Sequence, residues 1–130
     1  MEKSIQKLTM AFLVLMFTAI ALPSKVYAQD ATVKDPKHYK VEFENDEVRI
    51  LRITYGPGET SVMHSHPKGV AFFVTDYEAT FELSDGQVIE VSGKAGSTMW
   101  NDAAQHLPTN TGKKPMEVIQ VEFKSKKNNY

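Results

Sequence analysis

From residue 38 onward, apolar side chains recur at every second position, and this spacing limits the fold more than any other feature of the sequence. Successive side chains of an extended strand point to opposite faces, so this alternation marks strands with one buried face. It is clearest in residues 77–83. Each run closes on glycine, proline, asparagine or aspartate, and no long helical pattern intervenes. The sequence therefore predicts an almost all-β domain.

Turn residues divide this domain into short strands. Ser84-Asp85-Gly86 predicts a tight hairpin between residues 77–83 and residues 87–91. Many short strands are typical of a sandwich or barrel, and closure into a barrel removes exposed strand edges. We therefore expect one small β-barrel. Apolar residues expected to share the inward face are Leu51, Ile53 and Tyr55 in one strand and Ile119, Val121 and Phe123 in the last.

The first residues differ in character from the rest. Lys3 and Lys7 precede an uncharged segment, residues 8–22, and small residues close the region at Ala28. This layout is typical of a secretory signal peptide, and the uncharged segment is shorter than the roughly 20 residues that a membrane-spanning helix needs. We expect an exported protein, periplasmic or secreted, with no membrane attachment after cleavage. The expected organisation is a signal peptide at residues 1–28, a flexible arm at 29–37, the β domain at 38–124 and a charged tail at 125–130.

Charge and cysteine content narrow the possible partners and chemistry. The chain has 15 Lys and Arg against 16 Asp and Glu, so it lacks the basic surface that nucleic acid requires. It has no cysteine, which excludes disulfides, thiolate metal sites and cysteine nucleophiles. Any metal must therefore be held by nitrogen and oxygen.

Two histidines stand two positions apart, as His64 and His66. In a strand both imidazoles would point to the same face, and the apolar Val62 favours the inward face. Imidazole is the commonest protein ligand for transition metals, and His106 is the candidate for a third ligand. A His-x-His pair alone is more often a pair of surface or hydrogen-bonded histidines than a metal site, so the surrounding motifs matter.

Residues 58–66 contain glycine followed, after five residues, by His-x-His, and residues 96–110 run from glycine to His-x-x-x-Asn. These segments resemble the two motifs of the cupin superfamily, and the resemblance covers nearly the whole domain. The chain is similar in particular to small single-domain cupins, including those linked to β-alanine degradation, through Tyr-x-Val-x-Phe-Glu-Asn-Asp at residues 39–46 and His-Ser-His-Pro at 64–67. The resemblance implies an all-β, single-domain cupin jelly-roll β-barrel with a metal at its centre.

Two departures from the cupin pattern bear on the site. The usual carboxylate or amide ligand would fall at Val70 or Ala71, so the resemblance implies a three-histidine site of His64, His66 and His106 without a glutamate ligand. Three neutral imidazoles suit one divalent transition metal (Fe, Mn, Ni, Zn or Cu) and leave coordination positions open. Asn101-Asp102-Ala103 also replaces the second motif's Pro-x-Gly, which alters the turn into the third histidine.

Further side chains near the motifs are candidates for a pocket or for contact with a metal ligand. Gln105 and Glu59 are near enough in sequence to act as a fourth ligand or to hold a ligand in place, although such residues more often serve turns and solvent. Trp100 and Phe72 are candidates for the wall of a substrate pocket, the alternative being the core. Residues given structural interpretations are Phe73 in the core, Asn110 at a turn, and Arg49, Arg52 and His38 at the surface.

Three functions remain open at this stage. The first is a metal-dependent, dioxygenase-like enzyme acting on a small organic acid, thiol or phenol, with the metal carrying the chemistry because no separate catalytic residue and no organic cofactor site is recognisable. The second is a non-catalytic module that binds a small ligand or a metal. The third is a structural barrel without metal. The expected partner is a small molecule, and an exposed outer sheet face permits a homodimer.

Overall fold

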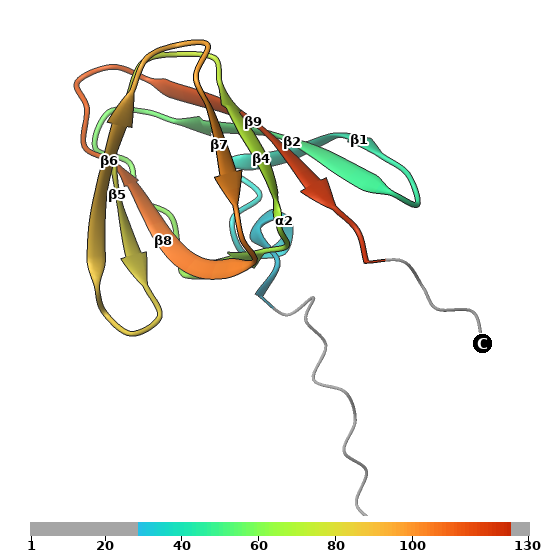
Figure 1. Ribbon diagram of the computed structural model, residues 1–130. Helices are drawn as coiled ribbons and strands as arrows, with labels where there is room; N and C mark the ends of the chain where they lie inside the picture. Colours follow the sequence, from blue (N-terminus) through green and yellow to red (C-terminus); the bar gives the residue numbers. More distant parts are fainter. Residues whose placement is uncertain (1–28, 126–130) are drawn as a thin grey trace, which may run out of the picture.

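The computed structural model describes residues 29–125 (Figure 1). The expected signal peptide and all but the first residue of the expected charged tail lie outside these residues. The described chain contains one short helix and a series of strands. In chain order these are α2 (Ala31–Lys34), β1 (Tyr39–Glu44), β2 (Val48–Tyr55), β3 (His64–His66), β4 (Gly69–Phe73), β5 (Tyr77–Leu83), β6 (Val88–Gly93), β7 (Thr98–Asn101), β8 (Ala104–Asn110) and β9 (Met116–Phe123).

The strands form two sheets. One has the order β1-β2-β9-β4-β7 and the other the order β3-β8-β5-β6, and Figure 1 shows them as two layers. The all-β prediction is confirmed. The closed barrel is not seen, because within the described residues no strand is hydrogen-bonded into both sheets. The alternation of side chains is the same in a sandwich and a barrel, so the sequence could not separate them. Across residues 29–125 no helix is long and apolar enough to cross a membrane.

The predicted hairpin is present as β5 and β6. Phe81 pairs with Ile89, and the amide of Gly86 donates to the carbonyl of Leu83 at 2.9 Å. Gly86 has a φ of 85°, which its lack of a Cβ permits and which the tight turn requires. The second strand begins at Val88, one residue later than expected.

The core lies between the two sheets. Leu51, Ile53 and Tyr55 of β2 face inward as predicted, and Phe73 of β4 is buried as predicted. Phe73 stacks on Tyr77 of β5 with ring centroids 3.6 Å apart. The fully buried or nearly buried apolar cluster consists of Ala31, Tyr39, Leu51, Ile53, Tyr55, Ala71, Phe73, Ala79, Met116 and Val118.

The inward face of β9 differs from the prediction. The buried residues are Met116, Val118, Gln120 and Glu122, whereas the expected Ile119, Val121 and Phe123 are half-buried on the outer face. Both phases of this strand carry apolar residues, so alternation alone could not choose between them. The inner phase can hold the buried Glu122 because its carboxylate finds partners in the interior, Arg49 and His66.

Helix α2 lies in the segment expected to be a flexible arm. Asp30 caps helix α2 by accepting from the amide of Thr32 at 2.9 Å, and Ala31 is fully buried. Asp35 is also buried, and α2 contacts β1 and β3. Such a short polar segment has no periodicity of its own, so only its tertiary contacts determine its structure.

Candidate metal centre

The three predicted histidines meet on the inner face of the smaller sheet. His64 and His66 project from the same face of β3, and the antiparallel pairing of β3 with β8 places His64 directly opposite His106. One ligand atom from each lies within 4.8 Å of the others. The inward direction is therefore as predicted, but the reason given was wrong. Val62 precedes the strand and is 48% exposed.

The ring nitrogens of the three histidines converge. Nε2 of His64 and Nε2 of His66 are 3.0 Å apart. The His106 ring lies edge-on to both, with centroids 5.0 Å from His64 and 5.3 Å from His66. Nε2 of His106 is buried and has no hydrogen-bond partner among the described residues. A buried polar atom without a partner is costly, so this nitrogen is suited to a ligand that the polypeptide does not supply.

The environment keeps two of these imidazoles neutral. Burial, reinforced by the neighbouring His66, lowers the pKa of His64 to about 4. Burial, reinforced by His66 and His64, lowers the pKa of His106 to about 3. A neutral imidazole has the free lone pair that coordination requires. Three converging nitrogen donors, one of them unpartnered, therefore fit one divalent transition-metal ion.

Nδ1 of His66 is held by a carboxylate that the sequence analysis did not identify. It lies 2.6 Å from Oε1 of Glu122, which is completely buried in β9. Oε2 of Glu122 accepts from Nε of Arg49 at 2.6 Å. Glu122 is thus a hydrogen-bond partner on the far side of the His66 ring from the other histidines. Such a partner fixes the tautomer and orientation of a ligand histidine.

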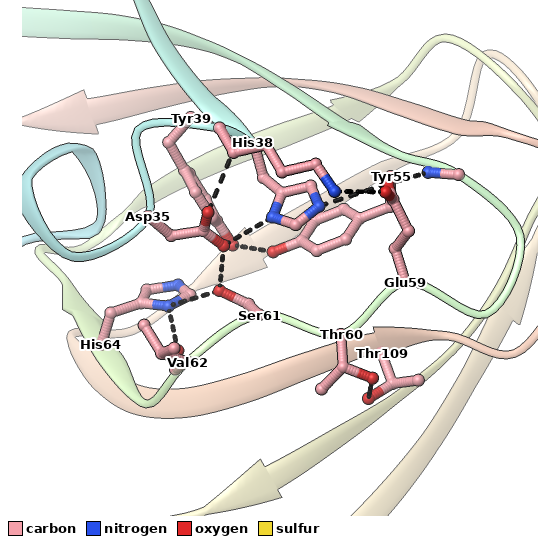
Figure 2. A network of polar contacts seen from close by, with 12 residues as sticks. Asp35, His38, Tyr39, Tyr55, Glu59, Thr60, Ser61, Val62, His64 and Thr109 are labelled. Atoms are coloured by element: carbon pink, nitrogen blue, oxygen red, sulfur yellow. Dashed lines mark hydrogen bonds and ion pairs between the residues drawn. The ribbon is translucent and has the colours of Figure 1, made fainter.

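Nδ1 of His64 is held by the loop before β3, as Figure 2 shows. It lies 2.7 Å from the carbonyl oxygen of Val62 and 3.3 Å from Oγ of Ser61. Donation from Nδ1–H to the carbonyl leaves the lone pair on Nε2, which faces the other two histidines. His106 has no such partner within residues 29–125 and stacks on Phe81, with ring centroids 4.9 Å apart.

A buried aromatic side chain forms one wall of the site. The Tyr39 ring packs against His64 and His66 with centroids 4.7 Å and 5.3 Å away. Its hydroxyl lies 2.7 Å from that of Tyr55. Burial raises the pKa of Tyr55 to about 12 and that of Tyr39 well above its ordinary value, so both remain neutral phenols. Tyr39 excludes water from one side of the histidines.

The other candidates near the motifs lie apart from the histidine nitrogens. Glu59 contacts Nε2 of His38 at 3.2 Å and the amide of Gly56 at 2.6 Å. Gln105 is exposed and, as the neighbour of His106 in β8, points to the opposite face of the strand. Trp100 is 56% exposed and Phe72 is 44% exposed on the larger sheet. The structure does not bring these four side chains together with the three histidines.

Two surface assignments are corrected. His38 is buried, because its ring stacks on Tyr55 and Nδ1 lies 2.6 Å from Oδ2 of Asp35. Arg49 has only 14% of its side chain exposed, because it pairs with Glu122 in the interior. Arg52 lies at the surface as expected, paired with glutamates of β1 and β9.

The expected turn role of Asn110 is confirmed. Its Oδ1 accepts from the amide of Gly112 at 3.0 Å, and its Nδ2 donates to the carbonyl of Lys114 at 2.9 Å. The same Nδ2 donates to the carbonyl of Gly56 at 3.1 Å. Asn110 therefore joins the loop after β8 to the end of β2.

Solved structures share this fold. No protein-family model matches the sequence, and no curated protein matches it. A cupin domain from Bordetella pertussis Tohama I is 18% identical, with a TM-score of 0.62 over 67% of this chain and 92% of that one. An RmlC-like cupin family protein with a double-stranded β-helix fold from Methanocaldococcus jannaschii is 20% identical, with a TM-score of 0.52 over 69% and 84%.

A cupin superfamily protein from Desulfitobacterium hafniense DCB-2 is 14% identical, with a TM-score of 0.51 over 67% of this chain and 76% of that one. At these identities the likeness shows the fold alone. The chain therefore has an all-β cupin fold with a three-histidine cluster inside it.

Proposed function

We propose that this protein binds one divalent transition-metal ion through Nε2 of His64, His66 and His106, and that the ion is the centre of chemistry on a small organic molecule. The observation that carries the proposal is the buried, unpartnered Nε2 of His106 beside the paired nitrogens of the other two histidines. Fe, Mn, Ni, Zn and Cu are all compatible with three imidazole ligands.

The number of ligands favours a reactive site over a structural one. Structural zinc sites are closed by four protein ligands, whereas catalytic sites commonly have three and an open position. Within residues 29–125 the metal-binding group contains the three histidines and no carboxylate. When bound, such an ion supplies Lewis acidity or reactivity toward dioxygen. A dioxygenase-like enzyme is the activity that we propose.

The chain's own residues would prepare the site. Glu122 and the Val62 carbonyl orient two of the imidazoles, so the donor atoms are in place before the metal arrives. Tyr39 screens one side from water, and its neutral hydroxyl is engaged by Tyr55. Small organic acids, thiols and phenols are the substrate classes to test, and the motif similarity to cupins of β-alanine degradation adds β-alanine derivatives.

The alternative is a non-catalytic module that binds a metal or a small ligand. The two functions differ in turnover. Purified protein loaded with Fe²⁺ should consume dioxygen in the presence of one member of the substrate panel, and His106→Ala should not. Stoichiometric metal binding without turnover on any member would favour the non-catalytic module.

Export and self-association complete the proposal. The N-terminal signal-like pattern supports export to the periplasm or the medium.

An apolar row crosses the outer face of the larger sheet, formed by the directly paired residues Phe43, Ile50, Val121, Val70 and Trp100. Phe43 and Trp100 at its ends are exposed, the three residues between them are half-buried, and contiguous apolar surface favours interaction with a partner. We propose that two copies pair through this apolar row.

A further inference from the structure

Asp30 begins a chain of short contacts that ends on a metal-ligand histidine. Its Oδ1 caps helix α2, and its Oδ2 accepts from Nη2 of Arg49 at 2.6 Å. Arg49 donates through Nε to Glu122 at 2.6 Å, and Glu122 lies 2.6 Å from Nδ1 of His66. The side chains of Asp30 and Arg49 are each 14% exposed, and that of Glu122 is completely buried.

In this series of contacts, the orientation of the Arg49 guanidinium is the part that can change. A buried carboxylate such as Glu122 needs a cation held in good geometry, and a guanidinium provides it only while its plane is fixed. Asp30 fixes that plane together with Glu122, because Nη2 of the guanidinium lies 2.6 Å from a carboxylate oxygen of each. Loss of the Asp30 charge would let Arg49 turn and would loosen Glu122, and with it the His66 ring.

Asp35 begins a second chain, which Figure 2 shows. Oγ of Ser61 donates its hydrogen to Oδ2 of Asp35 at 2.5 Å, and the same Oγ lies 3.3 Å from Nδ1 of His64. Because the hydroxyl hydrogen is directed to Asp35, the oxygen presents a lone pair to Nδ1–H of His64. This arrangement reinforces the tautomer already favoured by the Val62 carbonyl.

Both chains start from one short stretch of sequence, residues 30–38, named here the N-terminal segment. The segment is anchored by the completely buried Ala31 and by a parallel bridge between Asp30 and Ser65, the residue between the two histidines of β3. It contacts strand β3, and its two carboxylates reach the Nδ1 atoms of the histidines through other side chains. A docked segment thus holds both rings at once.

We propose that the N-terminal segment is a positioning element of the metal centre, in which Asp30 orients His66 and Asp35 orients His64 by separate routes. The inference rests on the proposed metal site and goes beyond it, because it makes metal affinity depend on residues that do not touch the metal. The coupling is reciprocal, so metal binding also holds the segment in place.

Two single substitutions test the two routes, one in each. Asp30→Asn preserves the helix cap, since asparagine caps as well as aspartate, and removes the charge and the acceptor oxygen that face Arg49. Ser61→Ala cuts the Asp35 route and spares the Asp35 contact with His38. Asp76→Asn is the matched control, because Asp76 is an exposed carboxylate paired with Lys94 outside both chains.

The readouts are the dissociation constant for Co²⁺ by chelator competition, the d–d spectrum of bound Co²⁺, and thermal unfolding without metal, all on untagged protein produced from the full-length sequence. We expect Asp30→Asn and Ser61→Ala each to weaken Co²⁺ binding about tenfold and to change the spectrum. Asp76→Asn should stay within about twofold of the original protein. In the unsubstituted protein, Co²⁺ should slow amide hydrogen exchange at Val33, Lys34 and Asp35.

Each contrary result would overturn a different part of the account. Variants that unfold at lower temperature yet bind Co²⁺ with unchanged affinity and spectrum would give the segment a structural role only, and the inference would be overturned while the metal site stood. Unchanged hydrogen exchange on Co²⁺ binding would overturn the reciprocal coupling. A folded, unsubstituted protein that binds no Co²⁺ would overturn the metal site and the inference together.

Discussion

Oε1 of Glu122 lies 2.6 Å from Nδ1 of His66, although the two residues are 56 positions apart in the sequence. The contact places a completely buried carboxylate behind a candidate metal ligand. It explains why a glutamate occupies the inward phase of β9, a position that would otherwise favour an apolar side chain. It also makes the interior of the sandwich polar between β9 of the larger sheet and the histidines of the smaller sheet.

Arg49→Met should destabilise the fold, because it leaves the Glu122 charge buried without its cation. Removal of one partner of a buried ion pair costs about 3–5 kcal/mol. The free energy of unfolding from urea titration of the metal-free protein measures this loss. Arg52→Met is the control, because Arg52 has the same charge and lies at the surface, and little change is expected. Equal effects of the two substitutions would contradict the interior pair.

Glu122→Gln should lower metal affinity by about tenfold to a hundredfold, the range seen when partners of ligand histidines are replaced. Glutamine keeps the shape of the side chain and one acceptor oxygen, but it removes the negative charge of Glu122, which contacts both Arg49 and His66. Competition between the protein and a chromogenic chelator for Zn²⁺ measures the change. Glu82→Gln, an exposed change in β5 outside the histidine cluster, should bind Zn²⁺ like the original protein. Unaltered affinity in Glu122→Gln would remove Glu122 from the metal centre.

The metal-free fold should lose stability as the pH falls from about 6.5. Burial lowers the pKa of His64 to about 4 and that of His106 to about 3, whereas both titrate near 6.5 in the unfolded chain. The unfolded state therefore binds more protons below pH 6.5, and the loss continues until the pH reaches the folded values.

Urea unfolding between pH 7 and pH 4 checks this dependence. His106→Leu removes one of the two groups and should reduce the slope of the unfolding free energy against pH. A slope that is the same in the original protein and in His106→Leu would contradict the low pKa of His106.

Gln120→Leu should stabilise the fold by about 1 kcal/mol. Nε2 of Gln120 is buried without a partner among the described residues, and a buried donor left unpaired costs about 1–3 kcal/mol. The substitution also removes the bond from Asn101 to Oε1 of Gln120 at 3.0 Å, but Asn101 is half-buried and can bond to water. Thermal unfolding measures the gain, with exposed Gln105→Leu as the control. A clear loss of stability would mean that Nε2 of Gln120 has a hydrogen-bond partner in solution.

Trp100→Gln should convert the proposed dimer to a monomer. Trp100 is 56% exposed at the end of the apolar row and stacks on Phe123, with ring centroids 6.0 Å apart. Sedimentation velocity gives the mass of the original protein and of the variant. Val88→Gln changes a similarly exposed side chain on the smaller sheet and should leave the dimer intact. A monomeric original protein would contradict the proposed pairing.

Local patterns in the sequence were sufficient for the strands and for the three histidines. Alternation predicted the inward face of β2, turn residues predicted the hairpin of β5 and β6, and the spacing of two placed His64 and His66 together. In each case the information lies within a few neighbouring residues. Pairing across a sheet then brought His106 opposite His64, as the motif similarity implied.

The partners of the histidines could not be predicted in this way, because they depend on contacts between distant strands. Gln120 and Glu122 share the phase of Met116 and Val118, and that was the available signal for an inward Glu122. The alternate positions Ile119, Val121 and Phe123 are more hydrophobic, and for that reason they were predicted to face inward. Asp30 lies in a segment without periodicity, where only tertiary contacts decide the conformation.

Metal content tests the central claim most directly. Untagged protein should contain about one equivalent of a first-row transition metal by elemental mass spectrometry, as purified or after reconstitution with Fe, Mn, Ni, Zn or Cu. His64→Ala and His106→Ala should lose it. His38→Ala, which removes the remaining histidine of the chain, should retain it. Absence of metal from the folded protein under all these conditions, or its retention in His106→Ala, would contradict a three-histidine metal centre.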